Sequence, residues 1–157
     1  DTASGLMTKE GTDTYGAQLS YSADQYAASV TYANYDTSTT DTTYWGLNGY
    51  WTPSETGTAV PSISVGYEVG NPNNTSVDTS HYFLGLQWDE IGPGTLGVAM
   101  GTKEHTSDNA TEYLEYEAFY SYPINDGMTL TPVIFVRETA EGTDDETGLA
   151  VKTSFSF

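Results

Sequence analysis

The sequence contains no cysteine and very few basic residues. Among 157 residues, 4 are Lys or Arg and 22 are Asp or Glu, so the formal net charge is -18. Without cysteine the chain has no disulfide framework, no thiol nucleophile and no cysteine-ligated metal. With so few basic side chains it cannot neutralise a row of phosphates, which excludes nucleic acid as a partner.

Long apolar runs are also missing. The sequence has no stretch of about 18 or more apolar residues, which excludes a transmembrane helix. Residues 1–10 lack the basic and apolar regions of a signal peptide, so we expect a mature form or a fragment of a longer protein. A transmembrane β-barrel stays open as an interpretation, because its strands alternate polar and apolar residues.

The residues that are present favour strands. Tyrosine dominates the aromatic residues, with 13 Tyr against 5 Phe and 3 Trp, and Gly and Thr are abundant while Leu is scarce. Alternation with a period of two predicts nine strands, and no stretch has a convincing helical period. The nine predicted strands are residues 14–22, 26–35, 43–52, 60–69, 81–89, 95–104, 112–122, 128–138 and 146–157. Each has about 9–12 residues, the length that a tilted strand needs to cross a bilayer.

The linkers between these strands alternate in kind. Four are turn sequences with Pro, Gly, Asn or Asp, at residues 22–25, 53–57, 90–94 and 123–127. The other four are mostly longer and made of Thr, Ser, Asn, Asp and Glu, at residues 36–42, 70–80, 105–111 and 139–145. Tight turns that alternate with long polar loops predict an all-β fold, an antiparallel up-and-down transmembrane barrel.

The two faces of the predicted strands differ in charge. One face, which includes Leu86, Val98 and Ile134, carries no charged residue. A basic residue at the middle of a bilayer costs about 2–4 kcal/mol, so contact with lipid would remove charge from one face. We expect the charged residues of the opposite face to line a water-filled pore: Glu68, Lys103, Glu115, Glu117, Arg137 and Lys152.

Aromatic residues collect at the ends of the predicted strands. Two groups are expected to form girdles at the two membrane–water interfaces: Tyr21, Trp51, Trp88 and Tyr122 beside the tight turns, and Tyr32, Trp45, Tyr67 and Tyr82 beside the long loops. A soluble β-sandwich or closed barrel with a dry core also has alternating strands and is the alternative. Its interior rarely collects aromatics at strand ends, so the girdles favour the membrane barrel.

Several segments resemble a known family. The alternation of residues 148–157 runs to the last residue, and Phe155 and Phe157 resemble the C-terminal signal that the barrel-insertion machinery reads in bacterial outer-membrane proteins. Residues 114–133 resemble the aromatic strand, Asn/Asp turn and following strand of cyanobacterial outer-membrane porins, relatives of the carbohydrate-selective OprB-type porins. Residues 16–22 resemble a further strand of that family. These segments occur in the same order as in the family, so the resemblance covers nearly the whole chain.

The resemblance implies a barrel of about sixteen strands, preceded by a periplasmic domain that binds the cell wall. Residues 1–157 would then be the C-terminal portion of the barrel, without the earlier strands and without that domain. Nine strands alone would leave two open edges in lipid, which is not viable. The family places the terminal Phe on the periplasmic side and the acidic loops outside, and a homotrimer is one assembly that it allows.

The function expected is passive diffusion of small polar solutes through the outer membrane, and sugars, inorganic ions and iron species all stay open as the solute. The acidic loops at residues 36–41 and 143–146 are expected to attract cations at the mouth, unless they only keep the surface soluble. An outer-membrane barrel for adhesion, phage attachment or wall anchoring is an alternative function, as is a soluble β-rich binding module.

An enzyme is not expected. His81 and His105 lie at the ends of different strands without a partner at metal-ligand spacing, so we predict no metal and no cofactor. Glu115 and Glu117 share one strand, whereas glycosidase carboxylates usually come from separate strands across a cleft.

Overall fold

The computed structural model describes residues 12–37, 39–75, 77–103, 106–108, 110–140 and 142–156. In this part of the chain it contains strands and turns, and no helix long and apolar enough to span a bilayer. The strands are β1 (Asp13–Ser22), β2 (Tyr26–Asp36), β3 (Asp41–Trp51), β4 (Ser62–Pro72), β5 (Thr79–Ile91), β6 (Gly94–Thr102), β7 (Thr106–Ser107), β8 (Leu114–Asn125), β9 (Met128–Arg137) and β10 (Glu146–Phe155).

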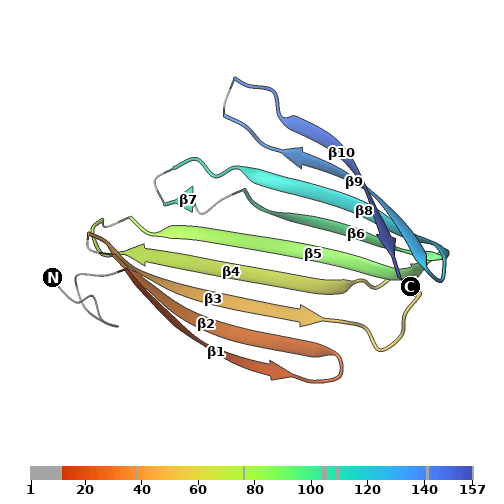
Figure 1. The fold of residues 1–157 in the computed structure, drawn as a ribbon, viewed down its shortest axis with the longest axis horizontal. Coiled ribbons are helices and arrows are strands. Elements are labelled where there is room, and N and C mark those ends of the chain that lie inside the picture. The colour runs from red at the N-terminus through yellow and green to blue at the C-terminus, as the bar shows by residue number, and fades with distance from the viewer. Residues whose placement is uncertain are drawn as a thin grey trace.

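All strands belong to one antiparallel sheet with the order β1-β2-β3-β4-β5-β6-β8-β9-β10, and β7 pairs with the start of β5. Every long strand therefore lies beside its neighbour in sequence, which confirms the up-and-down topology predicted from the linkers. Figure 1 shows these strands side by side in a curved sheet, with the turns after β1, β5 and β8 at one end and the connections after β2, β4 and β9 at the other.

Each of the nine predicted strands overlaps an observed strand, with ends that differ by up to three residues, but three linkers differ from the prediction. The connection after β3 is not a tight turn: residues 52–61 form a longer segment, held by hydrogen bonds from the Thr52 amide to the Gln25 carbonyl (2.7 Å) and from the Trp88 indole to the Ala59 carbonyl (3.0 Å). Strand β7 lies within the loop predicted at residues 105–111.

The third difference is at the end of β8. Residues 123–125 belong to the strand, so the turn consists of Asp126 and Gly127 alone. Proline has no backbone N–H to donate to a sheet and is tolerated at irregular positions. The register between β8 and β9 shifts between Pro123 and Asn125, which is how the strand continues through Pro123.

The sheet has no dry interior. No hydrophobic residue is buried in the described part of the chain, and apolar side chains such as Leu19, Ile134 and Leu149 are 74%, 51% and 76% exposed. A β-sandwich would cover one face with a second sheet, and the described strands form a single layer. The alternative of a soluble sandwich with a dry core is therefore wrong for this fold.

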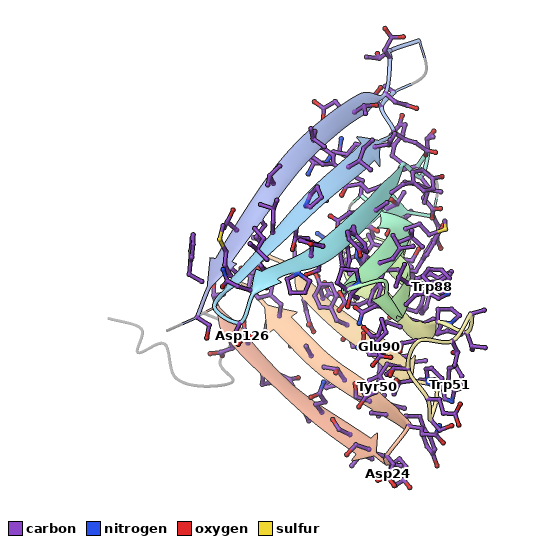
Figure 2. All side chains as sticks on the ribbon, turned by 90° about the vertical axis from the view of Figure 1, so that its right-hand side faces the viewer. Asp24, Tyr50, Trp51, Trp88, Glu90 and Asp126 are labelled. Atoms are coloured by element: carbon purple, nitrogen blue, oxygen red, sulfur yellow. The ribbon has the colours of Figure 1, made fainter. Side chains whose placement is uncertain are left out.

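Seen from the end with the tight turns, the sheet is a trough (Figure 2). Trp51 and Trp88 lie on its convex side, and Tyr50 lies on its concave side. Strands β1 and β10 are the two edges of the trough, and each pairs with one neighbour in the described chain. The curvature thus separates an outer face from an inner face, and the register assigns the remaining side chains to them.

Candidate functional site: the two faces of the sheet

The concave face is identified by following the register from Tyr50. Direct cross-strand partners link Tyr50 in turn to Ser64, Gly85, Ala99, Glu117, Phe135 and Gly148. Partners in an antiparallel pair, and residues two apart along a strand, project from the same face of a sheet. All six predicted pore-lining residues therefore lie on the concave face: Glu68, Lys103, Glu115, Glu117, Arg137 and Lys152.

Of these six residues, Lys103 lies just beyond the end of its strand. Its backbone amide donates to the Tyr113 carbonyl at 2.8 Å, which continues the ladder between β6 and β8 by one hydrogen bond. Lys152 lies opposite Thr131, towards the end with the tight turns, and Glu68 lies opposite Gly46 and His81. The predicted lining residues are thus distributed between the two ends of the strands.

The convex face is found in the same way from Trp51. Its register row continues through apolar or small side chains: Ile63, Leu86, Val98, Ala118, Ile134 and Leu149. All eight predicted girdle residues share this face: Tyr21, Trp51, Trp88, Tyr122, Tyr32, Trp45, Tyr67 and Tyr82. Phe155 also lies on it, opposite Met128 and 64% exposed, whereas Phe157 lies outside the described residues.

Ring contacts add three tyrosines to the ends of the convex face. Tyr15 lies 6.3 Å from Tyr32, Tyr26 lies 6.0 Å from Tyr21, and Tyr120 lies 6.4 Å from Tyr122, each distance joining ring centroids. Alternation along the predicted strands places these three residues on the uncharged face, but they were not among the predicted girdle residues. Their position within two residues of the end of a predicted strand, on the uncharged face, was the available signal.

Several aromatic side chains of this face direct their polar atoms towards the connections at the sheet's two ends. The Tyr82 hydroxyl donates to Glu112 at 2.7 Å, and the Tyr120 hydroxyl donates to the Ile91 carbonyl at 2.7 Å. The Trp88 indole donates to the Ala59 carbonyl. A ring with an apolar body and a hydrogen-bonded polar end suits a membrane interface, where one end is in lipid and the other is wet.

The main charge cluster of the concave face is centred on Arg137. Its Nε lies 3.1 Å from Glu115 Oε1, and its Nη1 lies 4.0 Å from Glu146 Oε2. Its guanidinium carbon lies 5.0 Å from the centre of the Phe135 ring. The side chains of Arg137 and Glu115 are 45% and 39% exposed, so the pair contributes little to stability, about 0–1 kcal/mol. Glu146 was not among the predicted lining residues, because only the register brings it opposite Arg137.

The rest of the concave face is largely uncharged. On β1 to β4 it carries small and polar side chains, with Glu68 as the only charged exception in these strands. A hollow of about 360 Å³ lies on this part of the sheet, and its lining includes Ser20, Ser29, Asn48, Tyr50 and Ser64. The other charged residues of the inner face lie on β5 to β10 or just beyond the end of β6, so charge is concentrated in that part of the described sheet.

Of the two histidines, the structure describes His81. His81 is the third residue of β5, close to the strand end where it was predicted, and its Nδ1 forms a hydrogen bond of 2.8 Å with the Thr102 hydroxyl. His105 lies outside the described residues. No group of three or more His, Cys, Asp or Glu side chains is arranged for a metal ion within the described ranges.

The comparisons with known proteins agree with this geometry. The chain is similar to the anion-selective porin from Comamonas acidovorans, with a TM-score of 0.73 and 13% sequence identity over 92% of this chain and 49% of that one. The likeness shows the fold, and the chain spans about half the length of that porin. No curated protein sequence matches the chain. Residues 1–146 match the family of Gram-negative porins, and the chain belongs to that family.

Proposed function

We propose that the chain forms part of the wall of an outer-membrane channel for passive diffusion of small polar solutes or inorganic ions. The observation that supports this most directly is the division of one curved sheet into two faces. The predicted lining residues occupy the concave face, whereas the convex face is uncharged between its aromatic ends and carries acidic residues such as Asp36 and Asp41 at strand ends. Lipid outside and water inside are the surroundings in which this division has the lowest free energy, because charge in the hydrocarbon is costly.

For the individual residues we propose the roles expected from the sequence. Glu68, Lys103, Glu115, Glu117, Arg137 and Lys152 line the pore, and Glu146 joins them at the end with the long loops. The eight girdle residues lie at the two interfaces. Phe155, exposed on the outer face, and Phe157 act as the signal for insertion, with the C-terminus in the periplasm. We propose that the chain is related to the cyanobacterial, OprB-related porins, because of the motifs at residues 16–22 and 114–133. We propose that the protein acts as a channel and not as an enzyme.

The complete channel needs more strands than the described sheet provides. Strands β1 and β10 each leave one side of the backbone unpaired in the described chain, and unpaired backbone groups are costly in lipid. We propose that the chain is the C-terminal portion of a larger closed barrel, which a periplasmic wall-binding domain precedes and which assembles as a homotrimer. The match to about half of a longer porin supports the first part of this proposal.

Ion preference follows from the charges near the mouth. Asp36 and Asp41 are direct partners in the register and share the convex face with Tyr32 and Trp45. Their side chains therefore project from the outer face of the sheet, whereas the sequence led us to expect them at the mouth of the pore. Residues 143–146 carry the acidic charge that adjoins the inner face through Glu146. We propose a preference for cations from this loop, weakened by salt because screening acts over about 8–10 Å.

Current measurements on the full-length protein in a planar bilayer test these proposals. We expect stepwise conductance and, under a salt gradient, a reversal potential of the sign that cation flow gives. A reversal potential of the opposite sign would overturn the cation preference but would not contradict the channel function. Absence of conductance from correctly inserted protein would overturn the channel and favour a role in adhesion, phage attachment or wall anchoring.

A further inference from the structure

Three phenylalanine rings on the concave face lie across glycines of the neighbouring strand. Each pair consists of direct partners in the register: Phe83 with Gly66, Phe119 with Gly97 and Phe135 with Gly148. The pairs come from different strand ladders, between β4 and β5, β6 and β8, and β9 and β10. The arrangement thus recurs across the part of the wall that also carries the charges.

The rings occupy the space that a side chain on the glycine would need. A Cβ atom built on Gly97 would fall inside van der Waals contact with Cε1 and Cζ of Phe119. The same holds for Gly148 against the end of the Phe135 ring, and for Gly66 against one edge of the Phe83 ring. Side chains on a strand normally stand roughly perpendicular to the sheet, so these rings lie flat because glycine leaves the neighbouring position empty.

We propose that Gly66, Gly97 and Gly148 set the free cross-section of the channel, by letting three phenylalanine rings lie against the wall. The proposal rests on the channel function proposed above. A methyl group on any of these glycines would force the partner ring into another staggered rotamer, directed away from the sheet and into the lumen. Each glycine is therefore a positioning residue for the size limit of the pore.

The Phe135 pair links pore size to charge. The Phe135 ring lies over Gly148 and also contacts the Arg137 guanidinium, whose carbon is 5.0 Å from the ring centre. A displaced ring would withdraw this support and move Arg137 relative to Glu115. Substitution of Gly148 is thus expected to change ion preference as well as conductance, whereas substitution of Gly97 should change conductance alone.

A purely structural role is the competing explanation. An aromatic ring over a glycine covers exposed backbone and stabilises the sheet, so under this explanation a substitution impairs only assembly. The two explanations differ in what they predict for correctly assembled channels. The structural role lowers the yield of folded protein and leaves the conductance of each channel unchanged. The positioning role lowers the conductance of each channel that does assemble.

The test uses Gly97→Ala in the full-length protein, with Gly85→Ala as the matched control. Gly85 lies on the same face, and a Cβ atom there would meet only the Ser64 Cβ, at an ordinary 3.8 Å. We expect Gly97→Ala to lower single-channel conductance and the size of the largest polyethylene glycol that enters the pore. Gly85→Ala should leave both near the wild-type values, and adding Phe119→Ala to Gly97→Ala should restore them.

Other results would overturn the proposal. Equal conductance for the Gly97→Ala and Gly85→Ala channels, or no recovery in the double variant, would show that the ring does not limit the pore. If Gly97→Ala does not assemble, the Phe119→Ala variant tests the proposal instead. A ring that lies flat predicts only a small change in the size of the largest polymer that enters the pore. A large increase in that size would show that the ring already projects into the lumen and would overturn the proposal. A wild-type protein without conductance would instead overturn the channel function itself.

Discussion

Arginine placed at Val98 should destabilise the assembled barrel, whereas arginine at the adjacent Ala99 should not. Val98 lies in the middle of β6 on the convex face, between Leu86 and Ala118 in the register. Ala99 lies on the concave face, between Gly85 and Glu117. The two substitutions therefore introduce the same charge at nearly the same depth, on opposite sides of the wall.

The expected difference follows from the medium on each side. A basic side chain on the lipid face near mid-depth costs about 2–4 kcal/mol, which lowers the folding equilibrium constant by a factor of roughly 30 to 900. An arginine at Ala99 enters water and lies opposite the carboxylate of Glu117, a favourable cross-strand pair, so its effect should stay within about 0.5 kcal/mol.

Equilibrium unfolding of the full-length protein in lipid vesicles measures both free energies. Because both variants receive the same side chain on the same strand, the difference between them isolates the surroundings of the two faces. Equal destabilisation, or a greater loss for Ala99→Arg, would refute the assignment of lipid to the convex face. The same result would refute the proposed channel, because the lumen of that channel is on the concave side.

Three further predictions concern single residues. Arg137→Gln should shift the reversal potential under a salt gradient towards greater cation preference, because it leaves Glu115 unpaired in the lumen, with a change in stability within about 1 kcal/mol; a shift towards anions would contradict the role of Arg137. Trp88→Phe removes the indole hydrogen bond to the Ala59 carbonyl and should make the 52–61 connection more sensitive to protease, as limited proteolysis of assembled protein would show; an unchanged cleavage rate would mean that this bond does not hold the connection. Phe155→Ala should lower the amount of assembled protein in the outer membrane of cells while refolding into detergent in vitro proceeds, and normal assembly in cells would exclude Phe155 from the insertion signal.

The strands and their two faces followed from the sequence because they depend on local patterns. Alternation with a period of two depends only on neighbouring residues, and it placed Leu86 and Val98 on one face and Glu115 and Arg137 on the other. Turn chemistry is also local. It identified the turn at Gly92 and Pro93, although it failed at residues 52–61, where hydrogen bonds to Gln25 and Trp88 shape the connection.

The tertiary structure decided what depends on register and curvature, which are not encoded in any single strand. Only the alignment of β9 with β10 brings Glu146 to Arg137 and Gly148 beneath Phe135. Alternation alone also cannot say which face becomes convex, because bending arises from the twist accumulated over many paired strands. The sequence thus determined that this chain has a charged and an uncharged side, and the folded sheet decided that the charged side faces inward.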